Sequence, residues 1–198
     1  MSSTEDYFMV VEGLLSADEC DMIIKEYEDS NLWKATGLYE YDKSITKCNA
    51  DQRNDSNVVN RDETCFSILI SRVKDRVPNG GYIDKLLFER SGIAVRLYTN
   101  KNKWCSVTKD EGYELLKFSR GNNLNIHVDN TSVLVRNITL SIALSDDYVG
   151  GEWYFPNEDK HLKISKGGAL MFPSNFLFPH CIKPIESGTR YSVVTWFV

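Results

Sequence analysis

The segment RNITLSIALSDDYVGGEWYFP, residues 136–156, decides the fold class. Apolar side chains alternate with small or polar ones along its first part, where Ile138, Leu140, Ile142 and Leu144 are separated by Thr139, Ser141 and Ala143. A period of two predicts a β-strand with the two kinds of side chain on opposite faces. We expect the apolar face to pack against helices and Thr139, Ser141 and Ala143 to face the interior. The pair Gly150-Gly151 then predicts a turn before another short strand at residues 152–155.

The same pattern of short strands and glycine turns extends over the C-terminal part of the chain. Residues 113–118, residues 169–172 after a Gly-Gly pair, and residues 191–198 each predict a further strand. About seven or eight short strands within roughly 85 residues are typical of a β-sandwich, a barrel or a jelly roll. Residues 113–198 are therefore expected to form a β core.

The N-terminal part is mixed and contains two predicted helices. Ser16 and Glu19 form a capping-box pattern, which predicts a helix that begins there and ends near residue 30. A second helix is predicted over residues 62–77, where apolar side chains recur at helical spacing: Phe66, Leu69, Ile70, Val73 and Val77. The sequence Pro-Asn-Gly-Gly at residues 78–81 is expected to end it, and residues 93–99 are expected to form a strand.

Length and composition favour one domain. The 198 residues, 42% of them hydrophobic, are enough to build a single core. The net charge of −5 disfavours binding to nucleic acid through bulk charge. The five cysteines are scattered, odd in number and without a Cys-x-x-Cys pair, which predicts reduced thiols in a cytoplasmic protein. No stretch approaches the roughly 20 apolar residues of a membrane span, so no membrane partner is expected.

Two of the three histidines stand in positions that suit a metal site. His127 and Asp129 are two residues apart, so on an extended backbone both side chains point to the same side. His180 lies at the start of another predicted strand. Two imidazoles and one carboxylate form the facial triad of non-haem Fe(II) oxygenases, which leaves positions open for other ligands. A bare His-x-Asp pattern is weak, and a zinc hydrolase can use the same ligand types.

Arg190 adds a second element to this constellation. It follows His180 by ten residues and lies on the last predicted strand. Its planar fork suits a carboxylate better than a lysine ammonium does. Ser192 projects from the same face of that strand and can add a hydroxyl donor. The two residues are therefore candidates for binding an anionic co-substrate.

Three segments carry a resemblance to a family: YELLKFSRGNNLNIHVDN, RNITLSIALSDDYVGGEWYFP and GGALMFPSNFLFPHCIKPIESGTRYSVVTWF. In this order and spacing they resemble the prolyl 4-hydroxylase-like 2-oxoglutarate/Fe(II)-dependent oxygenases. The resemblance implies a mainly β (α+β) fold, a double-stranded β-helix (jelly-roll) core with N-terminal flanking helices. Residues 1–198 would then be one oxygenase domain, with a helical flank and substrate-side loops at 1–112 and the jelly-roll core with the iron site at 113–198.

The resemblance also implies the site. Fe(II) would be bound by His127, Asp129 and His180, and the C5 carboxylate of 2-oxoglutarate would pair with Arg190, with Ser192 and Thr139 lining the pocket. Dioxygen would be the second co-substrate and ascorbate an accessory. The chain departs from the pattern at Phe118 and Ala143, where relatives carry tyrosine, and at Leu124, where another aromatic residue is common. These departures remove hydroxyl groups from the expected 2-oxoglutarate pocket.

The predicted reaction is hydroxylation of peptidyl proline coupled to oxidative decarboxylation of 2-oxoglutarate to succinate and CO2. The expected partner is a peptide or protein, with residues 36–60 and 99–112 as candidate substrate loops, including Tyr39, Tyr41 and Trp104. A hydroxylase of a small metabolite or free amino acid is the first alternative. A nucleic-acid demethylase is disfavoured because Trp196 stands where such enzymes carry a second arginine. A non-catalytic jelly-roll binding module is the last alternative.

Overall fold

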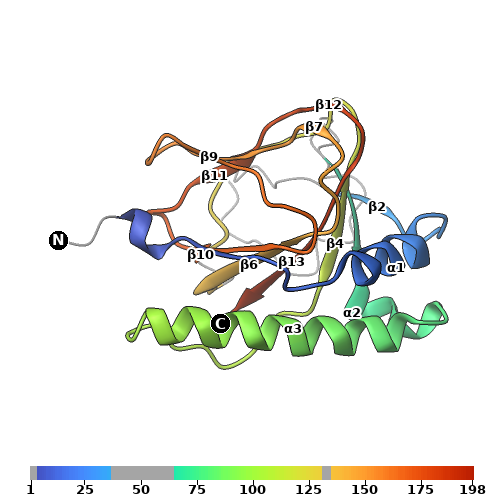
Figure 1. Cartoon of the computed structure of the whole chain (residues 1–198), viewed down its shortest axis with the longest axis horizontal. Coiled ribbons are helices and arrows are strands. Elements are labelled where there is room, and N and C mark those ends of the chain that lie inside the picture. Colours follow the sequence, from blue (N-terminus) through green and yellow to red (C-terminus); the bar gives the residue numbers. More distant parts are fainter. Residues whose placement is uncertain (1–3, 37–64, 131–134) are drawn as a thin grey trace, which may run out of the picture.

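A computed structural model describes residues 4–36, 65–130 and 135–198 as two facing antiparallel sheets flanked by helices (Figure 1). The larger sheet has the order β1 (Met9–Val11), β10 (Ala169–Pro173), β6 (Ile138–Ala143), β13 (Arg190–Phe197), β4 (Glu114–Phe118), β3 (Cys65–Leu69) and β2 (Lys34–Thr36). The smaller sheet has the order β5 (Leu124–His127), β11 (His180–Ile182), β8 (Trp153–Phe155) and β9 (Lys160–Leu162), and β7 (Val149–Gly150) pairs separately with β12 (Ile185–Ser187). This architecture confirms the predicted mainly β fold with flanking helices.

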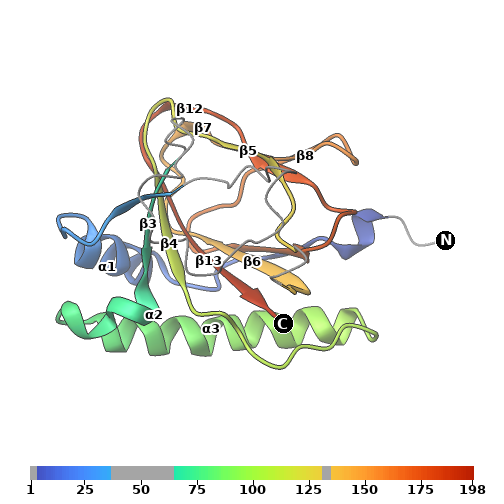
Figure 2. The same ribbon diagram turned by 180° about the vertical axis from the view of Figure 1, so that it is seen from behind.

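The helices lie on the outer face of the larger sheet. They are α1 (Ala17–Tyr27), α2 (Ile70–Val73) and α3 (Gly80–Lys101), with short 3-10 helices at Thr4–Tyr7 and Lys74–Arg76. Figures 1 and 2 show the long helix α3 running along this face, while the smaller sheet lies on the other side of the larger one. The site therefore has to lie between the two sheets, on the face of the larger sheet that the helices do not cover.

The alternation of side chains along β6 and β13 creates these two faces. Ile138, Leu140 and Ile142 form one face of β6. They belong to the same buried cluster as apolar residues of α1 and α3, and so does Leu144, just beyond the strand. Thr139, Ser141 and Ala143 point to the other side and are also buried. The prediction that the apolar face packs against helices is therefore confirmed. In β13, Arg190 and Ser192 likewise point away from the helices.

Helix α1 begins as the sequence predicts. The Ser16 hydroxyl accepts a hydrogen bond from the Glu19 backbone N–H at 3.1 Å, and the Glu19 carboxylate accepts one from the Ser16 N–H at 2.7 Å. Both interactions satisfy amide groups that the first helical turn leaves unpaired. The helix buries Cys20, Ile23 and Tyr27 and ends at Tyr27, three residues before the predicted end.

The helix predicted over residues 62–77 is wrong for most of its described part. Residues 65–69 form strand β3, in which Ile68 pairs with Leu115 of β4, and only Ile70–Val73 is α-helical. The apolar spacing of this segment fits a helix. It forms a strand instead, because its backbone N–H and C=O groups form hydrogen bonds with β4. Local periodicity cannot reveal that partner.

The strand predicted at residues 93–99 is also wrong, because these residues belong to helix α3. The helix buries one face through Ile83, Leu87, Ala94 and Tyr98, which recur at helical spacing over four turns. Residues 78–81 lead into this helix, which begins at Gly80, instead of ending one. A Cβ on Gly80 would lie 2.2 Å from the Lys74 carbonyl oxygen, so this close approach requires glycine.

The segment before residue 113 contributes more than helices. It supplies β1, β2 and β3, which are three of the strands in the larger sheet.

Of the loop expected at residues 36–60, only Thr36 is described, as the last residue of β2, and Tyr39 and Tyr41 lie outside the described residues. Within residues 4–36, 65–130 and 135–198, no helix combines the length and apolar character that crossing a membrane requires.

Candidate metal centre

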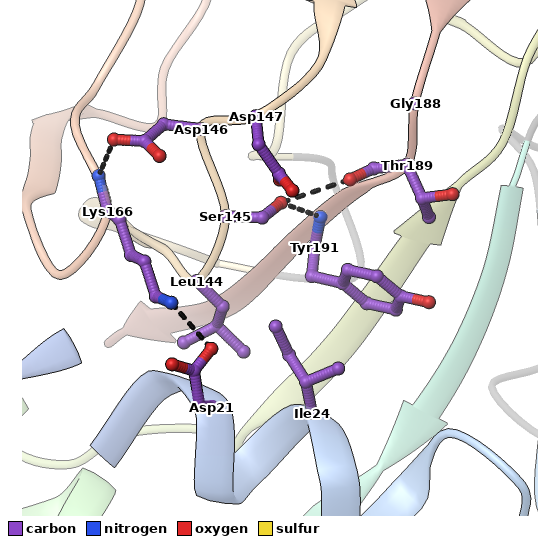
Figure 3. Close-up of a pocket in the computed structure, with 10 residues that line it drawn as sticks. All are labelled: Asp21, Ile24, Leu144, Ser145, Asp146, Asp147, Lys166, Gly188, Thr189 and Tyr191. Atoms are coloured by element: carbon purple, nitrogen blue, oxygen red, sulfur yellow. Dashed lines mark hydrogen bonds and ion pairs between the residues drawn. The ribbon is translucent and has the colours of Figure 1, made fainter. Parts of the chain in front are cut away.

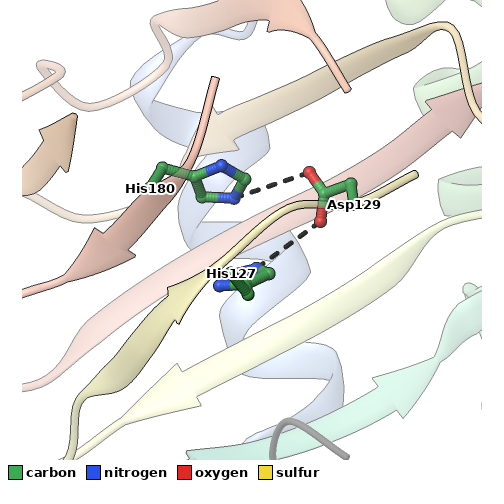
Figure 4. Close-up of side chains that lie close together, drawn as sticks. All are labelled: His127, Asp129 and His180. Carbon is green, nitrogen blue, oxygen red and sulfur yellow. Dashed lines mark ion pairs between the residues drawn. The ribbon is translucent and has the colours of Figure 1, made fainter. Parts of the chain in front are cut away.

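The smaller sheet brings His127, Asp129 and His180 together (Figure 4). His127 is the last residue of β5 and His180 the first of β11, and the two are paired in register. Asp129 follows β5 by two residues, and its two carboxylate oxygens each lie 3.5 Å from the Nε2 atom of one histidine. One ligand atom from each of the three side chains lies within 4.8 Å of the other two. This geometry can hold a metal ion.

Hydrogen bonds fix the orientation of both imidazole rings. His127 Nδ1 lies 2.8 Å from the Asn125 carbonyl oxygen, and His180 Nδ1 lies 3.0 Å from that of Phe178. A carbonyl oxygen only accepts, so each Nδ1 carries the proton and each Nε2 keeps a lone pair for a metal. Burial lowers the pKa of His180 to about 4, against the opposing effect of Asp129. His180 is therefore neutral near neutral pH, as a metal ligand must be.

Asp129 is held ionised and in place. Burial alone would raise its pKa, but His180, His127 and a hydrogen bond from Thr139 outweigh that effect and hold the pKa below its usual range. The Thr139 hydroxyl donates to Asp129 Oδ2 at 2.6 Å, and Thr139 Oγ1 lies 2.9 Å from Ser174 Oγ. Both hydroxyl residues are buried. This chain of contacts orients the carboxylate toward the two histidines.

Thr139→Val should weaken metal binding by about tenfold, because such supporting hydrogen bonds typically contribute 10- to 100-fold to metal affinity. The substitution keeps the branched shape and removes the hydroxyl that holds Asp129. Isothermal titration with Mn(II) measures the change. Thr195→Val is the matched control, because Thr195 is equally buried on β13 and its hydroxyl has no hydrogen-bond partner. Equal Mn(II) affinity in the two variants would show that Thr139 does not orient the ligand.

Arg190 forms a second polar centre in the same interior. Its side chain is 3% exposed, and its guanidinium carbon lies 5.3 Å from the Phe118 ring centroid and 5.6 Å from that of Trp153. Nη1 donates to Ser192 Oγ at 2.8 Å, and the buried Nε has no partner among the described residues. Among the described residues, no acidic side chain forms an ion pair with Arg190. A buried cation of this kind can bind an anion.

Trp153 lies between the two centres. Its ring centroid is 5.4 Å from that of His180, and the Arg190 guanidinium lies over the same indole. Burial lowers the pKa of Arg190, against the opposing effects of Tyr148 and Cys65, yet an arginine side chain keeps its charge near neutral pH. A molecule with a metal-binding group at one end and an anionic group at the other could therefore lie along Trp153.

The sequence model of the 2OG-Fe(II) oxygenase superfamily matches residues 113–198. The chain is therefore similar to this superfamily over its C-terminal part. Those residues contain both the three clustered ligands and Arg190.

Two curated relatives match this chain over part of its length. A PKHD-type hydroxylase of Synechococcus sp. (strain CC9902) is 35% identical over 82 residues, which are 38% of this chain and 36% of the relative. A PKHD-type hydroxylase of Prochlorococcus marinus is 31% identical over 94 residues, 44% of this chain and 42% of the relative. The chain thus aligns with less than half the length of either relative.

Solved structures match nearly the whole chain. A prolyl hydroxylase from Trichoplax adhaerens, in complex with a hypoxia inducible factor peptide fragment, gives a TM-score of 0.71 at 18% identity, covering 97% of this chain and 83% of that chain. A viral collagen prolyl hydroxylase from Paramecium Bursaria Chlorella virus-1 gives a TM-score of 0.65 at 17% identity, covering 96% of this chain and 94% of that chain. These likenesses confirm the jelly-roll fold, including the part before residue 113.

Members of this superfamily use Fe(II), 2-oxoglutarate and dioxygen, and the donor groups in the structure fit the first two. The two imidazoles and one carboxylate are the donor set of a non-haem iron site with open positions. The partnerless Nε of Arg190 and its burial without an acidic partner among the described residues fit a carboxylate. The fit rests on the chemistry of these side chains.

The structure places the other predicted site residues in two groups. Ser192 contacts Arg190, whereas the Thr139 hydroxyl contacts Asp129 and so lies at the metal end. Ser174 was missed by the sequence analysis, and its position directly after strand β10 was the available signal. The Phe118 ring packs beside Arg190, at a position where a tyrosine would have carried a hydroxyl.

A hollow of about 450 Å³ lies outside this interior, between α1 and the loops that flank β6 and β13 (Figure 3). Its polar groups are largely paired with one another. Lys166 forms an ion pair with Asp21 at 2.5 Å, and the Ser145 hydroxyl bonds the backbone of Thr189 and Tyr191. None of the three clustered ligands lines this hollow. It therefore adds nothing to the candidate site.

Proposed function

We propose that the chain is a 2-oxoglutarate- and Fe(II)-dependent dioxygenase that hydroxylates peptidyl proline. The observation that carries this proposal is that Trp153 lies between the cluster of His127, Asp129 and His180 and a buried Arg190 that has no acidic partner among the described residues. Oxidative decarboxylation of 2-oxoglutarate to succinate and CO2 would accompany hydroxylation. We further propose that residues 1–198 form one oxygenase domain, because β1, β2 and β3 extend the sheet that carries the site.

Each residue has a defined role in this proposal. His127, Asp129 and His180 would hold Fe(II), and iron bound there supplies the redox chemistry that activates dioxygen. Arg190 and Ser192 would bind the C5 carboxylate of 2-oxoglutarate and so orient its other end toward the metal. Thr139 and Ser174 would keep Asp129 aligned.

Aromatic rings around His180 would exclude water from the metal side of the site. The rings of Phe155, Phe172 and Trp153 have centroids 5.7, 4.8 and 5.4 Å from the His180 ring, and all three are buried. A dry environment strengthens the electrostatic interactions inside it and limits side reactions. These rings would therefore favour coupling of 2-oxoglutarate consumption to substrate hydroxylation.

Several observations favour a peptide over a nucleic acid. Both of the similar solved structures are prolyl hydroxylases, and one of them is bound to a peptide fragment. Trp196 lies six residues after Arg190 on β13, where a second arginine would suit a nucleobase. The guanidinium that stacks on Trp196, at 3.6 Å, belongs to Arg136, and Glu111 pairs with its charge at 2.7 Å. That charge is therefore already neutralised, and the net charge of the chain is −5.

A hydroxylase of a free amino acid or another small metabolite is the second candidate, since the metal and co-substrate centres would be the same for both.

The four cysteines in the described residues are all free, which supports the further proposal of a reducing, cytoplasmic location.

The test compares proline-rich peptides with free proline in the presence of Fe(II), 2-oxoglutarate and ascorbate. We expect the peptides alone to stimulate succinate release and to gain the mass of one oxygen atom on proline, measured by mass spectrometry. His180→Ala protein is the inactive control. Turnover of free proline with inert peptides would favour the metabolite hydroxylase. The absence of any succinate, with or without substrate, would favour a non-catalytic binding module.

A further inference from the structure

Tyr148 is a buried tyrosine beside the co-substrate end of the site that the proposed function leaves without a role. It precedes β7 and is 6% exposed, within the cluster of buried side chains between the sheets. The ring and the Arg190 side chain meet over Gly151. A Cβ on Gly151 would lie 3.0 Å from Tyr148 Cε2 and 3.3 Å from Arg190 Cδ. The absence of a side chain at this position lets the phenol and the guanidinium stem approach each other.

The hydrogen bonds between Arg190 and the hydroxyl groups around it have a defined direction. A guanidinium only donates hydrogen bonds, so a hydroxyl that contacts it must accept and keeps its own proton for another partner. Ser192 Oγ accepts from Arg190 Nη1 at 2.8 Å. The Tyr148 side chain also interacts with Arg190 and opposes the lowering of the arginine pKa by burial. The Ser192 proton is therefore available to an acceptor-only group such as a carboxylate, and a Tyr148 hydroxyl that accepts from Arg190 would keep its proton in the same way.

The strands on either side of β13 offer no replacement for the Tyr148 hydroxyl. Phe118 of β4 is paired with Arg190, and Ala143 of β6 is paired with Ser192. Neither side chain carries a hydroxyl, although both are buried in the same cluster. Tyr148 thus brings a phenol to a part of the site where its neighbours are apolar.

We infer that Tyr148 binds the far carboxylate of 2-oxoglutarate, its hydroxyl accepting a hydrogen bond from Arg190 and donating one to the carboxylate. Ser192 donates to the same carboxylate, so that Arg190, Ser192 and Tyr148 form one three-residue anion site. This inference rests on the proposed use of 2-oxoglutarate and names a residue that determines the selectivity for a dicarboxylate.

Tyr148→Phe tests the inference through binding alone. Isothermal titration of Mn(II)-loaded protein compares 2-oxoglutarate with 2-oxopentanoate, which has the same chain length but lacks the far carboxylate. Loss of one hydrogen bond to a charged group should weaken 2-oxoglutarate binding at least about tenfold. The affinity for 2-oxopentanoate and for Mn(II) should not change. Tyr154→Phe is the control, because the Tyr154 hydroxyl contacts Asp159 in the turn between β8 and β9.

Three results would overturn the inference, and they differ in what they imply for the function. Wild-type protein that binds Mn(II) but not 2-oxoglutarate would contradict the proposed function and this inference together. Wild-type binding with equal 2-oxoglutarate affinity in Tyr148→Phe would contradict only the role of Tyr148. An equal loss of affinity for 2-oxoglutarate and 2-oxopentanoate in Tyr148→Phe would show that the phenol supports the pocket structurally and does not touch the carboxylate.

Discussion

His180→Ala should abolish tight binding of Fe(II) or Mn(II) while the protein remains folded. His180 supplies one of three ligand atoms, and its Nε2 is held toward the others by the hydrogen bond between Nδ1 and the Phe178 carbonyl. Loss of a direct ligand should exceed the 10- to 100-fold typical of losing a supporting hydrogen bond, so we expect a decrease of more than about 100-fold. Titration calorimetry measures affinity, and circular dichroism checks the fold.

The third histidine provides the matched control. His161 lies on β9, where its ring is exposed and packs against Tyr154. His161→Ala should bind metal as the wild type does. Asp129→Ala should retain weak binding, because both imidazoles remain. Unchanged metal affinity in His180→Ala would mean that the three side chains do not form the metal site.

The helix-facing alternation along β6 could be predicted from the sequence because it depends on a local period. The same is true of the capping box at Ser16, where both partners lie within one turn. Residues 65–69 and 93–99 were assigned wrongly because their conformation depends on distant partners. The first segment forms a strand beside β4, and the second continues a helix that packs on the larger sheet. Short apolar runs do not carry this information.

The candidate site shows the same division between local and distant signals. The spacing of His127 and Asp129 indicated a shared face, and the structure brings His180 to them through the β5–β11 pairing. The contacts of Thr139 with Asp129 and Ser174 depend on the positions of three separate segments, so the sequence could not reveal them. The prediction that Thr139 lines the 2-oxoglutarate pocket missed this role for that reason.

Arg190→Ala should raise the Michaelis constant for 2-oxoglutarate by about two to four orders of magnitude. Removing one partner of a buried charge pair typically costs about 3–5 kcal/mol, because the other charge is left uncompensated. Arg190→Lys should be intermediate, since an ammonium keeps the charge but loses the planar fork. Succinate release at varied 2-oxoglutarate concentration measures the constant. Arg96→Ala, which changes an exposed arginine of α3, should behave as the wild type does.

Arg190→Met separates the binding role of the arginine from a structural one. A buried cation with a partnerless Nε contributes little to folding, so an apolar side chain of similar length should preserve or raise the thermal unfolding midpoint without ligand. In the presence of Mn(II), 2-oxoglutarate should raise the midpoint of the wild type, because a ligand that binds only the folded state stabilises it. The variant should lose most of that shift. A strong destabilisation without ligand would show that Arg190 has a partner within the protein, and an undiminished shift would place the far carboxylate elsewhere.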